Sequence, residues 1–93
     1  MIIIQADFNN VSRGRVNLTR MRRHRDTPFA ELARTGEPIL FVDYEEAAYG
    51  RLERDPTTGD WYAVPEWETQ HQVAPIPGRP AYEGYRRRVA APA

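Results

Sequence analysis

The 93-residue chain contains no cysteine and no lysine, and it has no long apolar run. The absence of cysteine excludes disulfides, thiolate zinc sites and cysteine nucleophiles. No stretch approaches the roughly 20 apolar residues that a membrane-spanning helix needs. The first residues, Met1 to Gln5, lack the basic and apolar regions of a signal peptide. The sequence therefore predicts a cytoplasmic protein with no membrane partner.

Signatures of catalysis and of metal binding are also missing. The one serine, Ser12, does not lie in a nucleophile elbow, and the two histidines stand in no nucleophile–base or metal-ligand pattern. The acidic run at Asp43, Glu45 and Glu46 lacks the ligand spacing of calcium loops. We therefore expect a non-enzymatic protein with no cofactor and no metal site.

What the chain does have is charge separated along its length, although its formal net charge is zero. Residues 1–25 hold six Arg and one Asp (+5), and residues 26–78 hold three Arg and eleven Asp or Glu (−8). Residues 79–93 hold four Arg and one Glu (+3). Charge segregated in this way steers partners of either sign, including a second copy of the same chain.

Apolar periodicity predicts five short strands. They cover residues 2–8, 14–21, 39–42, 47–54 and 61–64. The first two are expected to pair through a loop at residues 9–13. Pro56 and Gly59 predict a hairpin loop between the last two strands, and Gly50 in mid-strand predicts a bulge or a sharp bend.

One short helix is predicted after the second strand. Thr27 is the expected N-cap, Pro28 suits the first helical position, and Gly36 is the expected stop. Phe29 and Leu32 then form an apolar stripe at helical spacing. A helix of about two turns needs tertiary packing to persist.

These elements predict a mainly β domain with one short helix over residues 1–72, followed by a Pro-rich, Arg-rich C-terminal arm over residues 73–93. The expected architecture is a five-stranded bent sheet or a partly open barrel. In strand count and spacing, residues 1–67 resemble the SH3-like barrels, and this likeness is one of architecture alone. Helical spacing of Tyr82 and Tyr85 predicts a second short helix over residues 81–90.

The segment from Arg13 to Arg25 is the candidate for nucleic-acid binding. Guanidinium groups there would contact phosphates, and aromatic side chains on neighbouring strands would stack on bases. Its arginines are Arg13, Arg15, Arg20, Arg22, Arg23 and Arg25. The zero net charge opposes this function, because dedicated nucleic-acid binders carry a basic excess. The same arginines predict a lowered pKa for His24, which lies among them.

The preferred function is a non-catalytic protein-interaction or assembly module that binds itself or a protein partner. An aromatic edge and the basic arm carry this prediction, because Trp, Tyr and Arg are enriched in interface hot spots. The candidate residues are Tyr49, Trp61, Trp67, Tyr82, Tyr85, Arg86, Arg87 and Arg88. A tail that is disordered, or that folds onto its own domain, is the alternative for the arm. The alternative function is a nucleic-acid-binding accessory protein.

Overall fold

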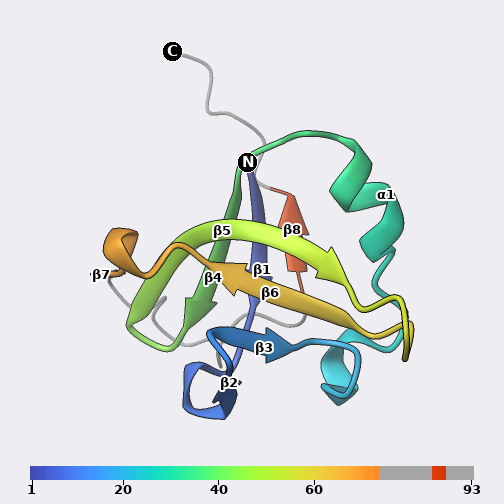
Figure 1. The fold of residues 1–93 in the computed structure, drawn as a ribbon. Helices are drawn as coiled ribbons and strands as arrows, with labels where there is room; N and C mark the ends of the chain where they lie inside the picture. The colour runs from blue at the N-terminus through green and yellow to red at the C-terminus, as the bar shows by residue number, and fades with distance from the viewer. Residues whose placement is uncertain (74–84, 88–93) are drawn as a thin grey trace.

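The computed structural model describes residues 1–73 and the backbone of residues 85–87. These residues form one mixed β-sheet, one α-helix and three single-turn 3-10 helices (Figure 1). The strands are β1 (Ile2–Gln5), β2 (Val11–Ser12), β3 (Arg15–Asn17), β4 (Ile39–Asp43), β5 (Glu46–Arg54), β6 (Trp61–Pro65), β7 (His71–Gln72) and β8 (Tyr85–Arg87). The helices are α1 (Phe29–Arg34), η1 (Phe8–Asn10), η2 (Arg22–His24) and η3 (Trp67–Thr69).

The sheet is open and strongly bent. Its strand order is β2-β3-β6-β5-β4-β1-β8, and β7 pairs separately with β5. The long strand β5 curves across the molecule (Figure 1), and it pairs with β4 through its first half and with β6 through its second. Gly50 is the residue at which β5 passes from one partner to the other. The prediction of a mainly β domain with a bent sheet and one short helix is confirmed.

The predicted pairing of the first two strands is wrong. β1 instead runs parallel to β4, with Ile2 opposite Ile39. β3 lies between β2 and β6. The physical reason is that β1 is buried on both faces, as is typical of a strand in the interior of a parallel pair. A hairpin at the edge of the sheet would leave one of those apolar faces in water.

Side chains alternate along β1 and β4 and build two apolar clusters. The main core contains Ile2, Ile4, Ala6, Val16, Leu18, Phe29, Leu32, Ile39, Phe41 and Ala63. The second cluster contains Ile3, Leu40, Val42 and Ala47, with Met1 and Val73 packed against it. Helix α1 covers the main core with Phe29 and Leu32. This packing supplies the tertiary support that a six-residue helix lacks alone.

The start of α1 differs from its prediction. Pro28 occupies the N-cap position, and no side chain caps the helix there. Thr27 instead places its hydroxyl 3.3 Å from the Nδ1 atom of His24. At the other end, Gly36 follows the helix with φ +69°, as expected for the residue that stops it. None of the helices in the described ranges has the length and apolar content that crossing a membrane requires.

The predicted helix over residues 81–90 is wrong for the residues that the structure describes there. Residues 85–87 form β8, which pairs antiparallel with β1 and places Tyr85 opposite Ile4 and Arg87 opposite Ile2. This part of the predicted arm therefore extends the sheet of its own domain. Tyr82 and Arg88, which belong to the predicted binding set, lie outside the described residues.

Candidate functional site

An open hollow of about 480 Å³ lies where the parallel strands β1 and β4 end. Three segments form it: η1, the turn between β4 and β5, and η3. We call it the acidic hollow. Its principal lining residues are Phe8, Asp43, Tyr44, Glu45, Glu46 and Trp67. The topology brings these segments together although Phe8 and Trp67 lie 59 residues apart in the chain.

Aromatic rings form one side of the acidic hollow. Phe8 meets Trp67 edge to face, with ring centroids 5.3 Å apart and an interplanar angle of 73°. The Trp67 indole N–H donates to the Gly14 carbonyl oxygen over 3.3 Å, which fixes the ring. Tyr44 is 76% exposed and adopts φ +50°, a value uncommon for any residue other than glycine. The hollow therefore has ring faces and edges within reach of a ligand.

Carboxylates also line the acidic hollow, and they repel one another. Asp43 accepts a hydrogen bond from the Phe8 backbone N–H over 3.0 Å. Burial raises the pKa of Asp43, and the nearby charges of Asp7 and Glu46 raise it further, against the opposing hydrogen bond from Phe8. Among the described residues, no basic side chain lies within 4 Å of a carboxylate of this hollow. Within residues 1–73, the negative charge of the hollow therefore has no ion-pair partner.

The acidic hollow does not have the arrangement of a metal site. Within residues 1–73, no three His, Asp or Glu side chains converge closely enough to hold an ion. One of its carboxylates, Glu46, already accepts a hydrogen bond from the Gln70 side chain over 3.1 Å. Carboxylates spread around an aromatic wall suit a larger, polyatomic cation such as a guanidinium group.

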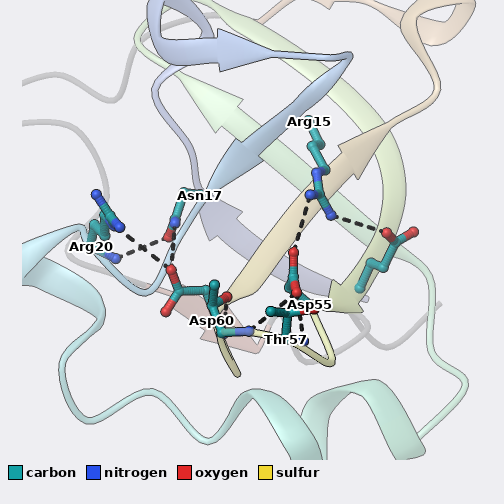
Figure 2. Close-up of polar contacts among 8 residues, drawn as sticks. Arg15, Asn17, Arg20, Asp55, Thr57 and Asp60 are labelled. Carbon is teal, nitrogen blue, oxygen red and sulfur yellow. Dashed lines mark hydrogen bonds and ion pairs between the residues drawn. The ribbon is translucent and has the colours of Figure 1, made fainter.

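The arginines of the Arg13–Arg25 segment divide into two groups. Arg15 pairs with Glu53 and Asp55 over 3.3 and 3.4 Å (Figure 2). Its guanidinium also lies 3.9 Å from the centre of the Tyr62 ring. Arg20 lies 3.7 Å from Asp60 (Figure 2). These two arginines are paired with carboxylates at the end of β5 and in the loop between β5 and β6. The pairing neutralises part of the positive charge that was predicted to bind nucleic acid.

The same loop adopts the predicted hairpin geometry. One oxygen of Asp55 accepts from the backbone N–H groups of Thr57 and Thr58 over 2.8 and 3.2 Å. Those hydrogen bonds lower the pKa of Asp55 and keep it ionised beside Arg15. Gly59 has φ +78°, so the left-handed residue expected before the chain returns is present.

The other arginines of the segment have different surroundings. Arg23 donates to the Gln5 side-chain oxygen over 2.8 Å. Arg13, Arg22 and Arg25 are exposed, and no carboxylate of the described residues pairs with them. Three of the six predicted arginines therefore remain available to a ligand.

The predicted aromatic edge is divided among three places. Trp67 lines the acidic hollow, whereas Trp61 packs near Phe29 with a centroid distance of 6.1 Å and lines a second hollow. Tyr49 is 41% exposed and stacks on His71 at 6.0 Å. The prediction missed Phe8, because the sequence placed it at the end of the strand expected over residues 2–8.

His24 is buried at the turn between η2 and α1, with only 2% of its surface exposed. Its contacts fit a neutral ring with the proton on Nε2, which donates to the Gln5 carbonyl oxygen over 2.7 Å. Burial lowers the pKa of His24, the bond to Gln5 opposes this, and the charge of Arg23 lowers it further. The predicted lowering of the pKa is confirmed, with burial rather than arginine as its main cause.

Acid is therefore expected to destabilise the domain through His24. The unfolded chain takes up a proton near the ordinary pKa of 6.5, whereas the folded chain does so at lower pH. The stabilisation is fully present above pH 6.5 and is lost as the pH falls below it. Urea unfolding of the His24→Gln variant measures this. In the variant, the free energy of unfolding should no longer fall through His24 as the pH drops below 6.5. The exposed control His71→Gln keeps this fall, and an equal fall in both variants would contradict the assignment.

No family model, curated protein or solved structure matches this chain. The likeness to SH3-like barrels therefore stays a prediction about architecture.

Proposed function

We propose that this chain is a non-catalytic protein-interaction module whose acidic hollow docks an arginine-bearing segment of a protein partner. The observation that supports this most is the set of carboxylates beside the ring pair of Phe8 and Trp67, which have no basic partner among the described residues. A guanidinium group can pair with a carboxylate and lie on an aromatic face at the same time. A lysine ammonium has no such flat face.

The shape of the acidic hollow suits a side chain of a docking peptide. Its volume of about 480 Å³ falls in the range of pockets that hold small ligands. The half-buried Asp43 lies among the lining residues and the exposed Glu45 lies at the turn, so a docked cation would meet one partly desolvated charge and one charge in water. Partly desolvated pairs contribute more to affinity than pairs at a solvated rim.

The chain itself contains a segment with the required chemistry, Gly84 to Arg88, which reads Gly-Tyr-Arg-Arg-Arg. In β8, the backbone of Arg87 lies opposite Ile2, at the end of β1 remote from the acidic hollow. This placement favours the hollow of a second copy over that of the same chain as the acceptor. Self-association through the arm is therefore one form of the proposed docking.

A fluorescence titration tests the docking. In full-length protein carrying Trp61→Phe, Trp67 is the sole tryptophan and reports on the acidic hollow. We expect a peptide with the sequence of residues 84–88 to change its emission, and we expect the same peptide with glutamines in place of its arginines to have no effect. The affinity should fall when salt is raised, because exposed charges are screened.

Two matched protein variants complete the titration. Glu45→Gln should lower the affinity for the peptide about threefold, which is the usual contribution of an exposed ion pair. Glu31→Gln, which removes an exposed charge on α1, should change nothing. Equal affinities of the two variants, or equal binding of the glutamine peptide, would contradict the proposal. The solution mass of the intact chain then separates a second copy from another protein as the donor.

A further inference from the structure

A second hollow, of about 340 Å³, lies between the start of α1, η2 and the loop that joins β5 to β6. We call it the tryptophan hollow. Its main lining residues are Thr19, Arg25, Thr27, Phe29, Gly59 and Trp61. It shares no lining residue with the acidic hollow. The protein docking proposed above therefore leaves it unused.

The tryptophan hollow offers a flat aromatic surface with hydrogen-bonding groups around it. Trp61 is half-buried and lies at 31° to Phe29, which is buried and backs the indole ring. The Thr19 hydroxyl accepts from the Trp61 backbone N–H over 2.7 Å, and its own proton stays free to donate. Along the described chain there is no protein acceptor for the indole N–H of Trp61. A flat ring system is the ligand that such a surface fits best.

Exposed arginines lie on the segment that borders the tryptophan hollow. Arg25 lines it, and Arg22 begins η2, whose last residue, His24, also lines it. Both arginines are exposed, and no carboxylate of residues 1–73 lies within 4 Å of either. Arg20 lies nearby in the sequence and its side chain is 80% exposed, but it pairs with Asp60 over 3.7 Å. Asp60 is also hydrogen-bonded by the Asn17 side chain over 2.9 Å.

We propose that the tryptophan hollow binds one base of a single-stranded nucleic acid. The base stacks on Trp61, and Arg22 and Arg25 hold the flanking phosphates. Base stacking on aromatic side chains combined with arginine contacts to the backbone is the general mode of single-strand binding. The hollow volume lies at the small end of ligand pockets and suits a single ring system. A double helix does not fit, because its bases are stacked on one another.

A titration with oligothymidine tests this site separately from the acidic hollow. In full-length protein carrying Trp67→Phe, Trp61 is the sole tryptophan, and we expect its emission to be quenched. For two phosphate contacts the logarithm of affinity should fall with the logarithm of salt at a slope of about −1.4. That slope corresponds to about a sevenfold loss of affinity between about 50 and about 200 mM salt.

Charge variants identify the residues responsible. Arg22→Gln with Arg25→Gln should weaken binding about tenfold and flatten the salt slope. Arg34→Gln with Arg51→Gln removes the same charge from exposed positions on α1 and β5, and it should leave both quantities unchanged. Equal effects of the two double variants would overturn the proposal, since they would indicate a response to net charge alone.

Three other results would also overturn the proposal. The first is the absence of quenching at low salt. The second is equal affinity for a duplex of the same length, which would indicate backbone contacts without base stacking. The third is equal affinity for thymidine monophosphate, which would identify a free nucleotide as the ligand. Failure of the peptide titration does not affect this test, because the two hollows have different reporters.

Discussion

Replacing Gly50 with alanine is expected to cost the domain a large share of its stability. A Cβ atom at this position would lie 2.8 Å from the Pro65 Cα and 3.0 Å from a ring carbon of Phe41, and it would overlap the Val64 carbonyl oxygen. Two of these three atoms are backbone, so β6 would have to move away from β5. Movement there would open the bend at which β5 changes partners.

The expected loss is about 3 kcal/mol, the upper end of the usual cost of overpacking. The free energy of unfolding of so small a domain is on the order of 5 kcal/mol, so the variant would keep only about 2 kcal/mol and would unfold at a much lower urea concentration. Urea unfolding followed by circular dichroism measures the loss. The sequence predicts a bulge or a bend at Gly50. The structure shows why glycine is needed there, since the backbone of β6 lies too close for a Cβ atom.

Gly36→Ala is the matched control for this prediction. Nothing lies within 4 Å of a Cβ atom built at Gly36, and its cost comes only from φ +69°. That cost is about 1 kcal/mol. If Gly50→Ala lost no more stability than Gly36→Ala, the backbone overlap at the bend would not be the decisive constraint.

The fold was predictable wherever the pattern is local. Every predicted strand appears, because short apolar runs and turn residues report directly on backbone conformation. The pairing of residues 2–8 was not predictable by the same rules, since hairpin logic assigns each strand its neighbour in sequence. The better signal in the sequence is the run of consecutive apolar residues Ile2 to Ile4. In the structure this run is buried on both faces of β1. Such a run indicates a strand covered on both faces.

The candidate site was predictable in its chemistry but not in its assembly. The acidic run and Trp67 were recognised from the sequence. The aromatic partner of Trp67 is Phe8. Strand β1 ends at Gln5, and Asp7 caps the turn that follows by accepting a hydrogen bond from the Asn9 backbone N–H over 3.0 Å. That turn moves Phe8 out of the strand pattern and toward Trp67. Contacts across 59 residues of sequence depend on sheet topology, which periodicity does not contain.

Replacing Asp43 with asparagine is expected to stabilise the fold and to weaken docking at the acidic hollow. Burial and the charges of Asp7 and Glu46 raise the pKa of Asp43 above 3.8, so its ionised form destabilises the folded state at neutral pH. The asparagine carbonyl can still accept the hydrogen bond of 3.0 Å from the Phe8 N–H. The free energy of unfolding should therefore exceed that of the wild type at pH 7, and the gain should shrink as the pH falls toward 3.8.

Binding should change in the opposite direction. Removing a partly desolvated carboxylate that pairs with an arginine should lower the affinity for the peptide about 30-fold. This corresponds to about 2 kcal/mol of binding free energy. The loss of affinity exceeds the threefold effect expected for the exposed Glu45, because less water screens the charge of Asp43. Urea unfolding and the Trp67 titration measure the two quantities on the same protein. A variant that gained stability while binding the peptide as tightly as the wild type would show that Asp43 is not kept for docking. Loss of both would indicate a structural role, since a carboxylate kept for a ligand destabilises the unbound fold and a structural one supports it.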